Sequence, residues 1–181
     1  MNESEHARVG LALVDLNELL TEITPLIAEL VGDDIAVSTE LAPGLDPIEC
    51  DRRHIAQAVL NLVANSRDAM PRGGRLVIRS GSATVLSGDA RYPDLAGGRY
   101  VSLTVADAGC GMTDEVKAHA FEPFFTTKEF GKGTGLGLPF VLGVVRSFGG
   151  DVAIESTVGV GTTVEMLFPP GDADIPIVVL G

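Results

Sequence analysis

The sequence contains no tryptophan, few other aromatic residues and only two cysteines. Cys50 and Cys110 lack metal-ligand spacing, and two thiols in 181 residues do not make a disulfide framework. We expect both to be free thiols in a reducing cytoplasm. No apolar run approaches the ~20 residues of a membrane helix, and the polar first ten residues do not resemble an export signal.

Basic residues are also scarce, with 13 Lys and Arg against 25 Asp and Glu, so the net charge is −12. This balance argues against a nucleic-acid surface, because such surfaces present clustered Lys and Arg to phosphates. An acidic protein that binds a polyanion needs local compensation from a metal ion, helix N-termini, backbone amides or a few placed cations. The 22 glycines make glycine-rich loops the natural place to look.

The hydrophobic periodicity predicts a mixed α/β layer sandwich with long connections. Apolar residues at helical spacing predict a helix over 16–31, with a possible bend at Pro25, and Asp51 is a credible N-cap for a helix to about Met70. The predicted strands are 34–41, 75–80, 100–106, 150–155 and 162–168. Short helices are expected over 114–120 and 136–148, and a loop over 87–98.

The helix that begins after Asp51 carries a polar stripe about 80° wide on an otherwise apolar surface. The stripe consists of His54, Gln57, Asn61, Asn65 and Asp68. Two asparagines one turn apart can present carbonyl oxygens to a hydrated cation and amides to phosphate oxygens. The spacing fits either such a site or a stripe that faces solvent.

Two glycine-rich segments follow further along the chain. Asp107–Gly111 comes directly after the alternating strand 100–106, where a carboxylate can accept a hydrogen bond from an exocyclic amine; the same residues fit a turn with an Asx cap. Gly131–Leu138 has glycine at alternate positions and opens into a helix, so it either exposes amides to an anion or forms a hinge. It is not a Walker motif.

Residues 112–132 connect these two segments and contain the aromatic run Phe121–Lys128. The run fits either a hydrophobic latch for a moving cover, with Lys128 and Lys132 near a triphosphate, or an aromatic satellite core with two solvated lysines. The segment 159–163 is a tight turn whose Thr162 reaches a ligand if the last strand lies beside Asp107.

In this order the segments resemble the sequence boxes of the histidine kinase catalytic domain, in the superfamily that also contains gyrase B, Hsp90 and MutL. The resemblance covers roughly residues 15–169, and the residues of its motifs are most similar to those of the nitrogen-regulation and hybrid kinase branch. The matching boxes are the Asn box Asn61–Met70, the Gly boxes Asp107–Gly111 and Gly131–Gly137, the phenylalanine box Phe121–Phe125 and the Gly-Thr pair Gly161-Thr162.

The resemblance implies a site for ATP and Mg²⁺ in an α+β, two-layer sandwich with a mixed, mainly antiparallel sheet. It implies Asn65 as the Mg²⁺ ligand, with Asn61, Asn65 and Lys128 as catalytic residues. Asp107 matches the acceptor of the adenine amine, Thr162 a second adenine contact, and 112–134 a mobile ATP lid. The other ATP-binding residues that it implies are Asp68, Gly109, Gly111, Met112, Phe121, Lys132, Gly133, Thr134, Gly135, Leu136, Gly137 and Leu138.

For the chain as a whole, the resemblance implies a two-component signalling kinase domain that passes the γ-phosphate to a histidine on a separate dimerisation domain. None of His6, His54 and His119 lies in a phosphoacceptor context, so we expect that domain to be absent from this chain. We expect a linker over 1–14, the catalytic domain over 15–169 and a tail or the start of another domain over 170–181. A response regulator receiver domain is the other expected partner, and the isolated domain is expected to be monomeric. The parent kinase can still be membrane-anchored.

The residue type at Asn61 distinguishes the kinases of the superfamily from its ATPases on chemical grounds. The ATPases of the superfamily hold a water-activating glutamate at the matching position, and general-base assistance is typically worth 10²–10⁴ in rate. Asparagine cannot take that proton, so we expect ATP to be held with little hydrolysis until a histidine arrives. A superfamily ATPase clamp and a degenerate docking module remain the alternatives. Ser66 and Pro139 depart from the usual residues, and the kinase assignment requires Asn65 and Gly135 to border one cavity.

Overall fold

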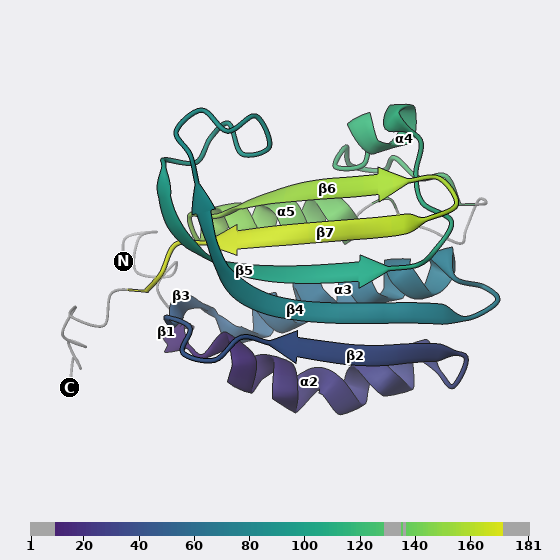
Figure 1. Cartoon of the computed structure of the whole chain (residues 1–181), viewed down its shortest axis with the longest axis horizontal. Helices are drawn as coiled ribbons and strands as arrows, with labels where there is room; N and C mark the ends of the chain where they lie inside the picture. Colours follow the sequence, from purple (N-terminus) through teal and green to yellow (C-terminus); the bar gives the residue numbers. More distant parts are fainter. Residues whose placement is uncertain (1–9, 129–134, 136, 172–181) are drawn as a thin grey trace, which may run out of the picture.

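Five strands form one sheet, and the helices α2, α3 and α5 cover one of its faces (Figure 1). The computed structural model describes residues 10–128, 135 and 137–171. The strand order is β2-β4-β5-β7-β6, in which β2 and β4 are parallel and the other neighbours antiparallel. The elements are β1 (Leu11–Val14), α2 (Leu16–Val31), β2 (Ile35–Leu41), β3 (Ile48–Asp51), α3 (Arg52–Ala69), β4 (Gly74–Val85), β5 (Gly98–Asp107), α4 (Asp114–Ala118), α5 (Gly137–Ser147), β6 (Asp151–Thr157) and β7 (Gly161–Phe168).

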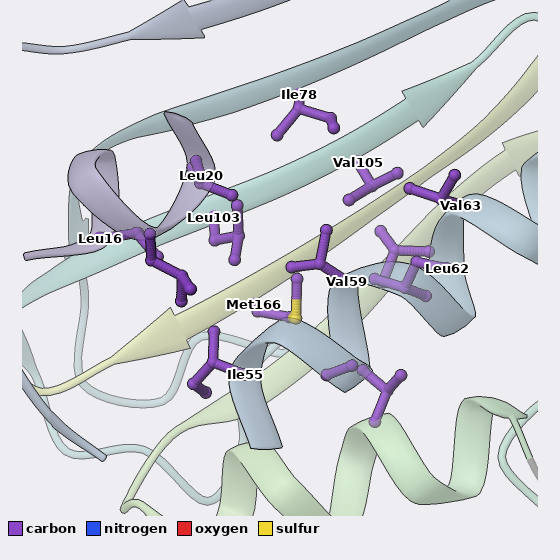
Figure 2. Close-up of a cluster of buried hydrophobic side chains, with 14 of the residues drawn as sticks. Leu16, Leu20, Ile55, Val59, Leu62, Val63, Ile78, Leu103, Val105 and Met166 are labelled. Carbon is purple, nitrogen blue, oxygen red and sulfur yellow. The ribbon is translucent and has the colours of Figure 1, made fainter. Parts of the chain in front are cut away.

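The hydrophobic core lies between this sheet and the helices (Figure 2). In β5, Val101, Leu103 and Val105 are buried while the residues between them are only half-buried, because successive side chains of a strand point to opposite faces. The core-facing residues include Leu16 and Leu20 of α2, Ile55, Val59, Leu62 and Val63 of α3, Ile78 of β4 and Met166 of β7. The central helix α3 is therefore buried along one face.

The expected α+β sandwich is confirmed, and so are both long helices. The helix α2 runs through Pro25 without ending there, and α3 begins after Asp51, whose side chain accepts a hydrogen bond from the Arg53 amide at 2.9 Å. The helix α3 ends at Ala69, one residue before Met70. Its bounds place the two asparagines of the stripe in its C-terminal half.

Two parts of the sheet architecture differ from the sequence-based expectation. The strand β4 extends to Val85 rather than ending near residue 80, because residues 81–85 pair with the first residues of β5 although they carry little apolar pattern. Residues 11–14, which we expected in a linker, form β1 and pair antiparallel with β3. Both strands have four residues, too few to show a period in the sequence.

The other face of the sheet is partly covered by the connection between β4 and β5. Tyr92 of this connection is fully buried with Val85, Tyr100 and Leu167, and its hydroxyl donates a hydrogen bond to Glu165 of β7. Burial, followed by the bond to Glu165, raises the pKa of Tyr92 well above its usual value. This small second core anchors the connection to the sheet, on the face opposite the helices.

Among the described residues, no helix has both the length and the apolar character needed to cross a membrane.

Candidate functional site

The C-terminal half of α3, the end of β5 and the first turn of α5 surround a cavity of about 430 Å³. These elements meet because β5 ends on the same side of the molecule as α4 (Figure 1), where α3 also ends. Both Asn65 and Gly135 border this cavity, so the condition set for the assignment is met. The cavity has two chemically different ends.

The first end, here called the carboxylate end, is built around Asp107, the last residue of β5. Asp107 Oδ1 accepts hydrogen bonds from the amides of Gly109 at 2.9 Å and Thr162 at 3.3 Å. Asp107 Oδ2 accepts one from the buried hydroxyl of Ser66 at 2.8 Å. A carboxylate has about four acceptor positions. One position on Oδ2 therefore remains for a donor in the cavity.

The sequence analysis singled out Ser66 only as a departure from the usual residue, and the structure shows what its hydroxyl does. Ser66 is 4% exposed and lies on the side of α3 that faces β5. Its only hydroxyl proton is used for Asp107, so it holds that carboxylate in place. The other departure, Pro139, lies in the first turn of α5, where the helix needs no N–H donor.

The turn 108–112 and the hairpin between β6 and β7 close the carboxylate end. Gly111 has φ +70°, and a Cβ there would lie 2.1 Å from the carbonyl oxygen of Thr157, so the close approach of the two segments requires glycine. Ser156 Oγ accepts a hydrogen bond from the Met112 amide at 2.8 Å and lies 2.8 Å from Thr162 Oγ1. Thr162 is thus fixed beside Asp107.

Apolar side chains that the sequence-based site did not include form the walls beside Asp107. Val105 and Val164 come from the paired strands β5 and β7, and Val116, Ala120 and Phe125 come from α4 and the segment after it. The strand period could have indicated the two valines. Val105 lies two residues before Asp107 and Val164 lies two residues after Thr162, so each valine shares a strand face with a predicted contact.

The other end of the cavity, here called the amide end, is lined by Asn61, Asn65, Asp68 and Lys128. The side chains of Asn61 and Asn65 are half-buried, and Asn61 Oδ1 accepts a hydrogen bond from Gln57 at 2.9 Å. Gly137 begins α5 beside Asn65, so close that a Cβ on it would lie 3.5 Å from Asn65 Nδ2. The N-terminus of α5 therefore lies at this end, where the positive end of its dipole favours an anion.

Lys128 joins the amide end from the segment that follows α4. Its Nζ lies 2.6 Å from Asp68 Oδ2 and 3.5 Å from Asn65 Oδ1. Partial burial on its own would raise the pKa of Asp68, but hydrogen bonds from Lys128 and Arg67 outweigh it and hold that pKa below its usual value. Asp68 therefore stays ionised and paired near neutral pH.

Several residues of the predicted site lie elsewhere. Phe121 does not line the cavity; it borders a shallow groove between α4 and β6 and packs against the main core. Gly109 lies behind Asp107, where a Cβ would come within 2.8 Å of the Ala69 carbonyl oxygen. In the polar stripe, exposed His54 lies near the Phe148 ring instead of the cavity, and Gln57 reaches the site only through Asn61. Lys132, Gly133, Thr134 and Leu136 lie outside the described residues.

The two cysteines are free and occupy contrasting surroundings. Cys50 is fully buried in β3, and burial, with a smaller contribution from Asp51, raises the pKa of its thiol to about 12. Cys110 is exposed and lines the carboxylate end.

Taken together, the cavity suits a ligand with a flat, hydrogen-bond-donating apolar part at one end and an anionic part at the other. Residues 50–172 match the family model described as histidine kinase-, DNA gyrase B-, and HSP90-like ATPase. The chain belongs to this ATPase family. The expected assignment to the histidine kinase catalytic and ATP-binding domain is thereby confirmed.

Curated relatives of this domain are sensor kinases. The chain is 41% identical to sensor kinase CckA of Brucella abortus over 87% of its own length and 17% of that protein. It is 34% identical to sporulation kinase D of Bacillus subtilis over 87% of its length and 28% of that protein. The chain thus spans well under a third of these relatives.

Solved structures of the family share the fold. The catalytic domain of histidine kinase ThkA is 27% identical, with a TM-score of 0.67 over 88% of this chain and 95% of that one. Full-length ShkA in complex with AMPPNP is 25% identical, with a TM-score of 0.71 over 90% of this chain and 32% of that one.

Proposed function

We propose that this domain binds Mg-ATP and transfers the γ-phosphate to a histidine on a separate dimerisation and phosphoacceptor domain of a two-component kinase. The proposal rests chiefly on one observation, the cavity in which the Asp107 carboxylate and the Asn61 and Asn65 amides face a common space. Family membership supports ATP as the ligand. A receiver domain that takes the phosphate onward is the expected further partner.

We assign the adenine ring to the carboxylate end. The remaining acceptor position of Asp107 Oδ2 fits the exocyclic amine of adenine, and Val105 and Val164 supply apolar surface for the ring. Met112 and Thr162 border the same end, and Thr162 is held by Ser156 and by its amide bond to Asp107. Burial of these contacts favours a base of one shape and one hydrogen-bonding pattern.

We assign the triphosphate to the amide end. The first turn of α5, which begins at Gly137 and continues through Leu138, offers the amides and the positive dipole end of a helix N-terminus. Lys128 adds a cation, and Asn61 can donate its amide protons because its oxygen accepts from Gln57. These groups supply the local compensation that a chain with net charge −12 requires.

The residues at the amide end fit Mg²⁺. Among the residues that the structure describes, no three His, Cys, Asp or Glu side chains gather as a metal site, so a metal here would depend on few protein ligands. Mg²⁺ commonly keeps several waters and binds substrate phosphates with one or two protein oxygens. Asn65 Oδ1 already attracts a cation, the Lys128 ammonium at 3.5 Å. Bound there, Mg²⁺ would neutralise phosphate charge.

The cavity lacks a free carboxylate to activate water, at least among its described lining residues. Asp107 accepts from three donors and its remaining position is assigned to the adenine amine, while Asp68 accepts from Lys128 and Arg67. Asn61 cannot serve as a general base. We therefore infer that the domain retains ATP and awaits an imidazole nucleophile aligned with the γ-phosphate.

Transfer to an acceptor fragment tests the proposal directly. The chain is mixed with Mg²⁺, γ-labelled ATP and a purified dimerisation domain from a related sensor kinase, and label on the acceptor is measured at acid and alkaline pH. We expect alkali-stable, acid-labile label that is lost with Asn65→Ala. Rapid release of phosphate by the isolated chain, lost with the same variant, would instead identify an ATPase clamp. No binding of ATP would leave only a docking module.

A further inference from the structure

One protein oxygen at the amide end is claimed by two cations. Asn65 Oδ1 is the metal ligand in the proposed function, and in the structure Lys128 Nζ lies 3.5 Å from it. The same ammonium is held at 2.6 Å by Asp68 Oδ2, one turn further along α3. The Lys128 ammonium thus lies near Asn65 while it is bound by a carboxylate on the same face of α3.

The lysine is not a loosely tethered surface side chain. The Lys128 and Asp68 side chains are only 34% and 35% exposed, and both line the cavity. The backbone amide of Lys128 also donates to Thr126 Oγ1 at 3.1 Å, which restrains the chain at this residue. Lys117, by contrast, pairs with Asp114 on α4 and lies outside the cavity.

Two cations cannot use Asn65 Oδ1 together. Mg²⁺ binds oxygen at about 2.0–2.1 Å and brings a shell of ordered ligands, which leaves no room for an ammonium on the same oxygen. The two positive charges also repel each other at such short range. The lysine, however, does not need to leave the site, because its stronger contact is with Asp68.

We propose that Lys128 and Mg²⁺ are alternative cations at Asn65, and that Asp68 retains the lysine nearby when the metal takes its place. The inference rests on the proposed function, which supplies the nucleotide and the metal. It adds that Lys128 serves as the counter-cation for metal-free nucleotide. The gain in nucleotide affinity on adding Mg²⁺ is therefore smaller in the wild-type protein, because the metal displaces a cation that is already present.

The test compares how much Mg²⁺ improves ADP binding in three proteins: the full chain, its Lys128→Met variant and Lys117→Met as the matched control. ADP affinity is measured by calorimetry in excess Mg²⁺ and in EDTA. The affinity gain on adding Mg²⁺ should be about tenfold larger in Lys128→Met than in the wild type, the effect of losing one charge-assisted contact. The control should give the wild-type gain.

An equal gain in wild type and Lys128→Met would overturn the inference, because the lysine and metal would then act independently. A smaller gain would overturn it too, since the two cations would cooperate. If ADP binds to none of these proteins, the proposed function fails and takes the inference with it. If ADP binds and its affinity gain on adding Mg²⁺ is the same in the wild type and Lys128→Met, the inference fails while the proposed function stands.

A second cycle locates the competition. In an Asn65→Ala background, Lys128→Met should leave the Mg²⁺ gain unchanged, because the shared oxygen has been removed. A Lys128 effect that persisted there would place the lysine's action on another group and overturn the assignment to Asn65. Unchanged thermal unfolding of each variant verifies that the comparison concerns folded protein.

Discussion

The two ends of the cavity are built on opposite principles. At the carboxylate end, strand and turn backbone and a buried hydroxyl fill three of the acceptor positions of Asp107, so the geometry is fixed before a ligand binds. At the amide end, the half-exposed Lys128 side chain makes one close ion pair and one long contact, which can be exchanged. The first arrangement favours selection of a base by shape; the second favours handling of a variable charge.

This difference implies that substitutions at the two ends fail in different ways. A change at the carboxylate end should lower both stability and nucleotide affinity, because the same hydrogen bonds serve the fold and the ligand. A change at the amide end should lower affinity or transfer with little effect on stability. The following variants test this contrast, from the largest expected effect to the smallest.

Asp107→Ala should have the largest effect. It removes the acceptor from Ser66 Oγ and from the amides of Gly109 and Thr162, at up to about 1–3 kcal/mol for each donor left unpaired in this partly buried place. Adenine-nucleotide affinity should fall by ~1.5–3 kcal/mol, roughly 10–150-fold. Urea unfolding and nucleotide titration measure the two losses. Asp107→Asn is the matched control, and wild-type affinity in Asp107→Ala would show that the base binds elsewhere.

Asn65→Ala should weaken Mg-nucleotide binding by about tenfold or more, since it removes a ligand oxygen for a charged group. Its free energy of unfolding should change by no more than about 0.5 kcal/mol, because Asn65 is half-buried and its side chain contacts Lys128 at long range. Calorimetry and urea unfolding on one preparation provide both numbers. A large stability loss without an affinity loss would reverse the proposed contrast.

Ser66→Ala should reduce stability by about 1 kcal/mol, the usual worth of one hydrogen bond, and lower the Tm by about 2–4 °C. Nucleotide affinity should fall by less than about threefold, because Asp107 keeps both backbone donors. Differential scanning calorimetry with and without nucleotide measures the effect. An affinity loss as large as that of Asp107→Ala would mean that Ser66 contacts the base itself.

Asp68→Asn should have the smallest effect, and one that depends on pH. The folded pKa of Asp68 is lowered from 3.8, so its pairing contributes stability above that value, and the contribution is lost as pH falls through the lowered folded pKa. The pair is about one-third exposed, so solvent screening limits it to at most about 1 kcal/mol. Urea midpoints of wild type and variant should differ at pH 7 and converge in acid below pH 3.8. A gap that widened in acid would contradict the pairing.

Regular elements with a strong period were predictable from the sequence. The cap at Asp51 and the 3.6-residue repeat correctly indicated α3, and with it the common face of Asn61 and Asn65. The short pair β1 and β3 was not predictable, because pairing partners far apart in the chain, such as Leu13 and Glu49 at a separation of 36 positions, stabilise strands too short to show a pattern. The extension of β4 to Val85 also depends on its partner β5.

The polar stripe of α3 shows the same limit of prediction from sequence within one helix. Periodicity placed His54 and Asn65 in one stripe, yet only the C-terminal half of the stripe reaches the cavity. The reason is that α5 covers one part of α3 and leaves room for the cavity at the other part, where α5 begins at Gly137. Similarly, the order of the boxes identified the family, but it assigned Phe121 to the site although that ring packs beside α4 and β6.

The sequence by itself determined the long helices, the longer strands, the family and the polar residues available to the site. These features depend on the local hydrophobic period and on the order of the motifs. Only the tertiary structure decided that Ser66 holds Asp107 and that Lys128 pairs with Asp68 across 60 positions. The physical reason is that a hydrogen bond depends on distance and direction in space, and separation along the chain specifies neither.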